Sequence, residues 1–335
     1  MTTKIKYTFK DFASDQDVRW CPGCDDYVIL RSIQKALPEI GKKKEDIVFI
    51  SGIGCSSRFP YYMDNYGIHG IHGRAAAIAT GTKLANPNLS VWVASGDGDS
   101  TAIGGNHFIH VLRRNVDLNY ILFNNEIYGL TKGQFSPTSL LGQKTKTSPY
   151  GNTQQPFNPG ELAIGAQAKF FARVAGNDAK LQTKIYIEAD KHRGTSLVEV
   201  LQNCVIFNDG CYTDITDKSV KDDAQLVVEH GKPMIFGKDK NKGIVLDGMK
   251  LKVVTIGENG ITEDDILVHD AKEADPSLHL ALINMHSPTV MGVIRAVDSP
   301  TLTDRENEVT EYAKKVSPIK SFNDLLFSGE TYEVE

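Results

Sequence analysis

The stretch GDGD at residues 96–99, followed by NNE at residues 124–126, decides the fold of this 335-residue chain. Each stretch follows an apolar run with the length of a buried strand, Ser90–Ala94 before the first and Leu118–Phe123 before the second. The segment between them, Gly104–Arg114, is compatible with a helix. Parallel strands joined by a right-handed helical crossover end at the same edge of their sheet. Both polar stretches are therefore expected to meet at one carboxyl edge.

The residues of these two stretches suit a divalent cation and a diphosphate. Asp97 can offer a carboxylate and Asn125 an amide oxygen to Mg²⁺, which prefers oxygen ligands and accepts phosphate oxygens at its other positions. Gly96 and Gly98 let the backbone approach a diphosphate closely. GDG followed at this interval by NN resembles the thiamine diphosphate (TPP) motif. A GDG turn alone is common after strands, whereas the two loops, their spacing and their flanking strands together are specific.

Composition places the chain among soluble globular proteins. It is 41% hydrophobic and 24% charged, which is ordinary for that class. The net charge of −5 and the lack of a basic cluster argue against a nucleic-acid partner. The N-terminus lacks an apolar signal core and no segment has the length of a membrane span, so we interpret the protein as cytoplasmic, without a membrane partner.

Strand-like and helix-like segments alternate along the first two thirds of the chain, which predicts an α/β fold with a parallel sheet. The long polar loop at Tyr128–Gln155 has a length that is usually functional in such a domain. The periodicity predicts further strands at Asp46–Ile50 and Ser196–Leu201, and helices at Asp26–Ile40, Arg74–Ala85, Pro159–Phe170 and Asp178–Lys191.

The character of the sequence changes after residue 212. Tyr212–Leu246 is charged and weakly periodic. Beyond it we expect short strands at Leu251–Ile256 and Leu280–Asn284 and one helix at Glu306–Val316. Because few apolar runs remain, residues 213–335 are predicted to form a C-terminal extension, an arm or small subdomain that contacts a partner.

Four of the five cysteines are expected at the same carboxyl edge. Cys21 and Cys24 form a CPGC turn that can fold over the edge, while Cys55 follows the first strand and Cys204 the last core strand. Four thiolates from separate segments suit a [4Fe–4S] cluster or a Zn(Cys)₄ site, and metal chemistry alone does not choose between them. An electron acceptor is useful beside a cofactor that makes carbanions, whereas zinc would be idle there. Cys211 is interpreted as a free thiol.

The whole series of motifs resembles one family. CPGC, SGIGCSSR, HGIHGRAAAIATGTKLANP, GDGDSTAIGGNH, NNEIYGLTKGQFSPT and LQNCVIFND occur in order over roughly residues 12–212. This series resembles the β subunit of 2-oxoacid:ferredoxin oxidoreductases, most of all the 2-oxoglutarate type. The resemblance implies a parallel-sheet domain of the diphosphate-binding type at residues 1–212, which carries TPP, Mg²⁺ and one [4Fe–4S] cluster.

The resemblance also assigns site residues. It implies Cys21, Cys24, Cys55 and Cys204 as cluster ligands, and Asp97, Asn125 and the carbonyl of Ile127 as Mg²⁺ ligands. It implies that TPP is contacted by Ile53, Gly54, Cys55, Ser56, His72, Gly96, Gly98, Asp99, Gly129, Leu130 and Thr131, together with Asp97 and Asn125. The family usually has Gly after CPGC, where this chain has Asp25, and we expect Asp to tolerate a left-handed conformation there.

By the same resemblance, the reaction interconverts 2-oxoglutarate, CoA and oxidised ferredoxin with succinyl-CoA, CO₂ and reduced ferredoxin. No second αβ half follows residue 212, so the glutamate that activates the TPP ring is expected on an α subunit with a pyrimidine-binding domain. Alternatives are a pyruvate or broad-specificity enzyme of the same family, a non-redox TPP decarboxylase or carboligase with structural zinc, and a nonenzymatic TPP- or metal-binding regulator.

Overall fold

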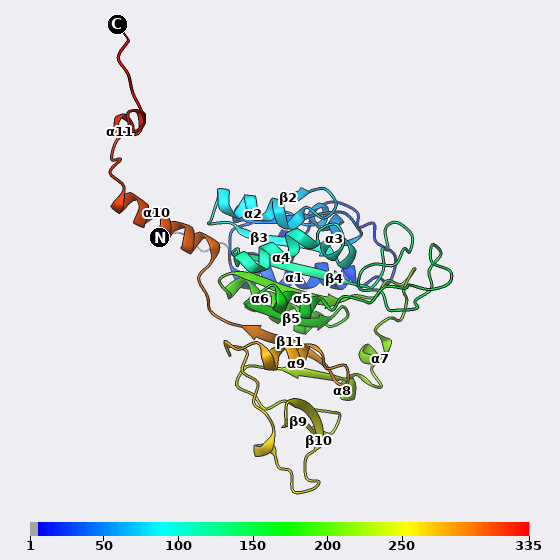
Figure 1. Ribbon diagram of the computed structural model, residues 1–335. Helices are drawn as coiled ribbons and strands as arrows, with labels where there is room; N and C mark the ends of the chain where they lie inside the picture. The colour runs from blue at the N-terminus through cyan, green and yellow to red at the C-terminus, as the bar shows by residue number, and fades with distance from the viewer. Residues whose placement is uncertain (1–5, 335) are drawn as a thin grey trace.

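The computed structural model describes residues 6–334, which form one large sheet, a small sheet and a projecting C-terminal arm (Figure 1). The large sheet has eight strands in the order β2-β1-β3-β4-β6-β5-β11-β7. The six strands from β2 to β5 are mutually parallel. β11 is antiparallel to β5, and β7 is parallel to β11, so these two strands run in the opposite direction. The predicted α/β class with a parallel sheet is confirmed.

The strands of the large sheet are β1 Ile47–Ser51, β2 Tyr66–His69, β3 Ser90–Gly96, β4 Leu118–Asn124, β5 Phe170–Ala175, β6 Thr195–Leu201, β7 Gln225–Val228 and β11 Thr289–Ala296. The small antiparallel sheet contains β8 Ile235–Phe236, β9 Lys242–Asp247 and β10 Lys250–Thr255. The helices are α1 Asp26–Ile40, α2 Ala75–Ala85, α3 Asp97–Thr101, α4 Gly105–Arg114, α5 Pro159–Gly165, α6 Ala179–Lys191, α7 Thr213–Thr216, α8 Lys221–Ala224, α9 Ser277–Ile283, α10 Leu302–Val316 and α11 Phe322–Leu326.

Helices cover both faces of the sheet. On one face, α1 and α6 pack on a cluster that includes Phe49, Trp92 and Ile121. On the other face, the cluster contains apolar residues of α2, α4, α5 and α9. The central strands are buried along their whole length and read as continuous apolar runs, as strands covered on both faces do. The sheet, with a layer of helices on each face, holds the loops at its carboxyl edge in fixed positions.

Two predicted elements after the long loop are wrong. The helix predicted at Pro159–Phe170 ends at Gly165, and β5 starts at Phe170, because the run FFARVA pairs with β6 and is fully buried. The strand predicted at Leu280–Asn284 lies instead in helix α9. A short apolar run does not distinguish a buried strand from a buried helix, so burial in the tertiary structure decides. The strand predicted at Leu251–Ile256 is present as β10, one residue earlier.

The C-terminal third takes part in the main body. β7 and β11 extend the large sheet beyond β5, so residue 212 does not separate two sheets. Residues after β11 behave differently: α10 and α11 project away from the body, and neither contains a buried residue (Figure 1). In the region 6–334 no helix combines the length and the apolar character that a membrane crossing would need.

The arm leaves the body at the edge of the sheet opposite the polar loops. Leu302 N–H donates to Asn115 O at 3.3 Å, and Arg193 pairs with Asp304 at 2.5 Å. Asn115 lies just before β4 and Arg193 just before β6, at the amino ends of these strands. The arm therefore starts at the amino edge and points away from the carboxyl edge.

Candidate functional site

A small cavity lies at the carboxyl edge of the sheet, where the loops after β1, β3 and β4 meet. Its volume is about 90 Å³. It is lined by Asp26, Ile53, Gly54, Cys55, Ser56, His72, Gly96, Asp97, Gly98, Asp99, Phe123, Asn125, Ile127, Tyr128, Gly129, Leu130 and Thr131. The structure thus brings together every residue that the sequence resemblance assigned to TPP or Mg²⁺. The crossover geometry that places the two polar stretches at one edge explains this convergence.

Asp97, like Asp26 and Asp99, is a buried carboxylate of the cavity. It begins helix α3 directly after β3 and is only 2% exposed. Ser136 Oγ and Thr138 Oγ1 donate to the same oxygen, Oδ2, at 2.6 and 2.5 Å. Oδ1 is left without a side-chain donor from residues 6–334, which suits an oxygen ligand for a cation. Burial raises the pKa of Asp97 to about 6, against the lowering effect of these hydrogen bonds, so it is ionised at neutral pH.

Asn125 is held in one orientation by Gln202, the residue that follows β6. Its Nδ2 donates to Gln202 Oε1 at 2.7 Å, and its Oδ1 accepts from Ile127 N at 3.2 Å. With the nitrogen fixed on Gln202, the amide oxygen faces the backbone of Ile127 and keeps a second lone pair. Gln202 Nε2 also reaches Cys24 Sγ at 3.2 Å, so it links the oxygen ligands to the cysteines.

Asp99 is hydrogen-bonded to several of the segments that surround the cavity. Its Oδ1 accepts from Gly73 N at 2.7 Å and Ile53 N at 3.1 Å and pairs with His72 Nδ1 at 2.5 Å, while Oδ2 accepts from Ser95 Oγ at 2.6 Å. Both carboxylate oxygens are therefore engaged by the protein. Asp99 is predicted to contact the cofactor; in the structure it lines the cavity and also ties together the loops around it.

Two glycines make this packing possible. A Cβ atom at Gly52 would lie 2.0 Å from Asp99 Oδ2, so a side chain there would expel the carboxylate. A Cβ atom at Gly98 would lie 2.2 Å from the ring of Tyr128, whose hydroxyl donates to Gly98 O at 3.1 Å. Gly98 of the GDGD stretch thus leaves room for the ring of Tyr128, which lines the cavity, as well as for a ligand.

The CPGC turn places two thiols at the rim. Cys24 N–H donates to Cys21 O at 3.1 Å, and Gly23 supplies the left-handed residue of the turn with φ of 84°. The expectation that Asp25 occupies a left-handed conformation is wrong, because its φ is −64°. Its carboxylate instead accepts from Asn203 N at 2.9 Å and ties the turn to the segment after β6.

Cys55 and Cys204 both lie close to Gly129. A Cβ atom there would be 3.6 Å from Cys55 Sγ and 3.4 Å from Cys204 Sγ. Burial, with Asp26 as a further cause, raises the pKa of Cys55 to about 12 and that of Cys24 higher still, so both thiols need a cation to become thiolates. Cys55 and Gly129 also line the cavity, so the thiols and the oxygen ligands share a wall.

The thiols are near one another without forming a single-ion site. Within residues 6–334, no three His, Cys, Asp or Glu side chains form a group that could hold a metal ion as they stand. Tetrahedral zinc needs four donors about 2.0–2.3 Å from one ion. Cys211 lies beyond β6, with Sγ 3.9 Å from Gln202 O, and burial raises its pKa to about 12.

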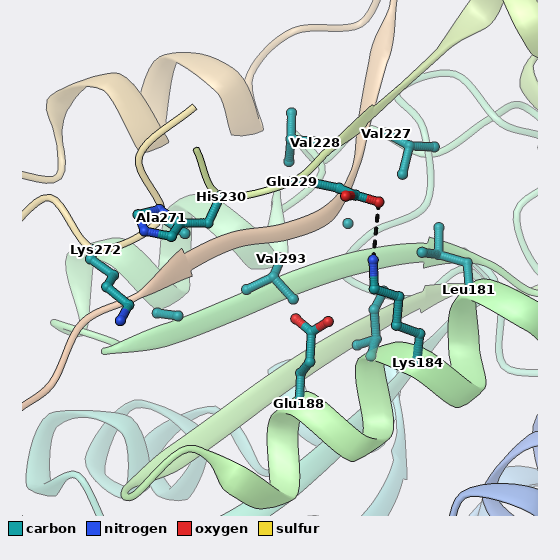
Figure 2. Close-up of a pocket in the computed structure, with 13 residues that line it drawn as sticks. Leu181, Lys184, Glu188, Val227, Val228, Glu229, His230, Ala271, Lys272 and Val293 are labelled. Atoms are coloured by element: carbon teal, nitrogen blue, oxygen red, sulfur yellow. Dashed lines mark hydrogen bonds and ion pairs between the residues drawn. The ribbon is translucent and has the colours of Figure 1, made fainter. Parts of the chain in front are cut away.

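Two other cavities within residues 6–334 contain none of the predicted site residues. One, of about 310 Å³, lies between α6 and the β11–β7 edge, where Lys184 and Glu229 pair at 3.0 Å (Figure 2). Both partners are half exposed, so the pair contributes little to stability. A larger cavity, of about 590 Å³, is lined in part by Glu126. Burial raises the pKa of Glu126 to about 7.

Several residues of the site were not predicted from the sequence. Asp26, Phe123 and Tyr128 line the cavity, and Ser136, Thr138 and Gln202 hold the predicted ligands in place. Ser136 and Thr138 belong to the long polar loop, so its length was the available signal. Gln202 precedes Cys204 by two residues and carried no signal of its own.

Comparisons with known proteins agree with this geometry. Residues 52–200 match the model of the thiamine pyrophosphate enzyme C-terminal TPP binding domain. The chain is 48% identical over 340 residues to the 2-oxoglutarate oxidoreductase subunit KorB of Mycobacterium tuberculosis, covering 100% of this chain and 90% of the relative. It is 46% identical over 203 residues to the 2-oxoacid:ferredoxin oxidoreductase subunit beta of Saccharolobus solfataricus, covering 60% of this chain and 67% of the relative.

A solved structure resembles the fold over almost its whole length. It is the 2-oxoglutarate:ferredoxin oxidoreductase from Magnetococcus marinus with 2-oxoglutarate, coenzyme A and succinyl-CoA bound, which matches with a TM-score of 0.79 and 30% identity. The match covers 98% of each chain. With the fold, the cavity and a full-length relative in agreement, the chain belongs to the family of KorB subunits, the β subunits of 2-oxoglutarate:ferredoxin oxidoreductases.

Proposed function

We propose that this chain is the β subunit of a 2-oxoglutarate:ferredoxin oxidoreductase. The reaction converts 2-oxoglutarate, CoA and two oxidised ferredoxins to succinyl-CoA, CO₂, a proton and two reduced ferredoxins, or runs in reverse. The observation that carries the proposal is the single cavity that joins Asp97, Asn125 and His72 to the wall formed by Cys55 and Gly129. Bound TPP would supply the carbanion chemistry at the keto carbon, and a neighbouring redox centre would pass on the two electrons one at a time.

The residues around the cavity fit Mg²⁺ and a diphosphate. Asp97 Oδ1, Asn125 Oδ1 and the carbonyl of Ile127 would hold the cation, since these are hard oxygen donors. Ser136 and Thr138 would keep Asp97 oriented, and Gln202 would do the same for Asn125. The turn from Gly129 to Thr131 and the loop from Ile53 to Ser56 would enclose the diphosphate.

The cysteines support a [4Fe–4S] cluster held by Cys21, Cys24, Cys55 and Cys204. Four thiols come from three separate segments around one rim, which matches the Cys₄ ligand set of such clusters. Four thiolates suit a cluster or a zinc ion alike, and the use of an electron acceptor beside a carbanion-forming cofactor favours the cluster. Cys55 would then bring the cluster against the wall of the cofactor cavity.

A second chain is needed to complete the active site. A volume of about 90 Å³ is well below the ~300 Å³ at which small-molecule pockets begin, so the cavity has room for only part of TPP. None of the described residues that line it is glutamate, the residue expected to activate the pyrimidine ring. Ile71 and Ile103 near its mouth are 73% and 54% exposed. We infer that an α subunit covers these side chains and supplies the pyrimidine half of the site.

The C-terminal extension is proposed to contact a partner chain through its arm. Val309, Tyr312 and Val316 follow each other at helical spacing on α10 and are all exposed. Phe322 and Leu325 continue the apolar side chains on α11. Because the arm starts at the amino edge, its contact lies away from the cofactor cavity.

Removing residues 302–335 is therefore expected to weaken association with the α subunit at least about tenfold, as loss of an apolar interface contact does. The body should stay folded, because neither helix of the arm contains a buried residue. Co-purification and titration calorimetry measure the effect. Val309→Ser should reproduce part of it and the neighbouring Glu308→Ser should not. Wild-type affinity in the truncated chain would refute partner contacts by the arm.

The substrate assignment is tested by turnover of the anaerobic αβ complex. Ferredoxin reduction with 2-oxoglutarate well above that with pyruvate supports the proposal. Pyruvate as the preferred substrate would favour the pyruvate or broad-specificity alternative, and decarboxylation without ferredoxin reduction would favour a non-redox TPP enzyme.

A further inference from the structure

The outer face of helix α4 carries basic side chains without acidic partners. Helices α2 and α4 lie side by side over one face of the sheet, and neither contains an acidic residue (Figure 1). His107, His110 and Arg114 are spaced i, i+3 and i+7 along α4, which places them on one side of the helix. Arg113 is bonded to this group, because its Nε donates to His110 Nδ1 at 3.2 Å.

Arg74 adds a third guanidinium group next to the start of α4. It is the exposed N-cap residue of α2. The preceding residue, Gly73, packs directly against Ile103, since a Cβ atom on Gly73 would lie 2.6 Å from Ile103 Cγ2. Burial lowers the pKa of His107, and the nearby Arg74 and Arg114 lower it further. Together with Arg113 and His110 these residues form one cluster, which we call the α4 basic face.

The stability of the two helices does not explain the three arginines. A cation is favourable in the last turn of a helix, where Arg113 and Arg114 lie, but it is unfavourable at a helix N-terminus, where Arg74 lies. All three are exposed. Within residues 6–334, the arginines that form ion pairs with carboxylates are others, namely Arg19, Arg173 and Arg193. The α4 basic face is therefore free to pair with anionic groups of another molecule.

This face lies between the two places where the chain is proposed to contact an α subunit. As part of the crossover from β3 to the parallel strand β4, α4 runs from the carboxyl edge of the sheet to its amino edge. Ile103, near the mouth of the cofactor cavity, comes just before α4. Asn115, which accepts from Leu302 N–H where the arm starts, comes just after it. The ten residues of α4, about 15 Å long, therefore connect the two contacts.

We propose that the α subunit covers the α4 basic face with an acidic surface, whose carboxylates pair with Arg74, Arg113 and Arg114. This inference rests on the proposed function and names the chemistry of the partner. A guanidinium group covered by a neutral surface would lose its water without gaining a partner, which is costly, so the covering chain needs carboxylates here. Opposite charges also speed the encounter of two chains and make its rate fall as salt is added.

The test is the rate at which this chain associates with the α subunit, measured anaerobically by stopped flow at about 0.05 M and about 0.5 M salt. The double variant Arg74→Glu/Arg114→Glu is expected to associate at least about tenfold more slowly at the lower salt concentration, with a smaller salt dependence. It should fold, because both side chains are exposed. Lys250→Glu is the matched control: it makes the same change of charge at an exposed site on β10 and should keep the wild-type rate.

Conservative variants identify the group on the partner. Arg74→Lys and Arg114→Lys keep the charge and should keep most of the rate. Carbodiimide treatment of their complexes should join the introduced amine to an aspartate or glutamate of the α subunit, which mass spectrometry detects. Equal rates and equal salt dependence in the wild type and the double variant would overturn this inference alone. Unchanged association with weakened CoA binding would also overturn it, because the face would then serve phosphate groups. Failure of the wild type to associate with the α subunit would instead overturn the proposed function, which needs the αβ complex.

Discussion

Replacing Asp97 with Ala is expected to lower the Mg²⁺-dependent affinity for TPP by at least about a hundredfold and to abolish turnover, because the proposed Mg²⁺ site would lose its one charged ligand. The loss should be specific to TPP binding. Asp97 is buried, and the hydroxyl groups that donate to it, those of Ser136 and Thr138, lie on another loop. Asn125→Ala should have a milder effect, because an amide oxygen carries no net charge. Calorimetric titration with TPP and Mg²⁺ measures both effects.

The control for Asp97→Ala is Asp15→Ala, which removes an exposed carboxylate outside the cavity and should leave TPP affinity unchanged. Thermal unfolding should show that Asp97→Ala still folds. Ser136 and Thr138 lose a hydrogen-bond acceptor, but removing a buried carboxylate with a raised pKa also removes the cost of desolvating it. Unchanged TPP affinity in folded Asp97→Ala would contradict the assignment of the motif.

The second large effect concerns the cysteines. Anaerobic protein is expected to contain about four iron and four sulfide per chain, as a Cys₄ cluster requires. Cys204→Ser should bleach its visible spectrum and reduce electron transfer to ferredoxin at least about a hundredfold, while TPP affinity stays near wild type because Cys204 does not line the cavity. Cys21→Ser and Cys24→Ser should behave in the same way.

Cys211→Ser is the matched control, because Cys211 is a half-buried thiol on the same side of the body that the ligand set does not need. It should keep both iron and activity. Stoichiometric zinc without sulfide in the wild type would contradict the electron-transfer role and favour the structural-zinc alternative. Loss of the cluster in Cys211→Ser would show that the ligand set is wrong.

The position of the site followed from the sequence, because strand order in a parallel sheet fixes which loop ends meet. GDGD and NNE each follow a strand, and β3 and β4 are neighbours in the sheet. The role of Asp99 did not follow. Its donors, Ile53, Gly73 and Ser95, come from three separate parts of the chain, and only their packing shows that the carboxylate is fully engaged.

The C-terminal third was harder to predict for a similar reason. β7 has only four residues and pairs with β11, which in turn pairs with β5. These pairings join segments far apart in the chain, which no local pattern reveals. The run Leu280–Asn284 is apolar enough for a strand but packs as part of helix α9. The secondary structure of these elements therefore depends on packing between segments far apart in the chain, and their local sequence does not reveal it.

The most direct test of the half-site account is 2-oxoglutarate-dependent ferredoxin reduction, measured anaerobically for this chain alone, for the α subunit alone and for their mixture, with CoA, TPP and Mg²⁺ present. The residues proposed to hold the diphosphate line a cavity of about 90 Å³, which is too small for the whole cofactor. We therefore predict turnover only in the mixture, with 2-oxoglutarate preferred over pyruvate. Full 2-oxoglutarate-dependent ferredoxin reduction by this chain alone would contradict the account.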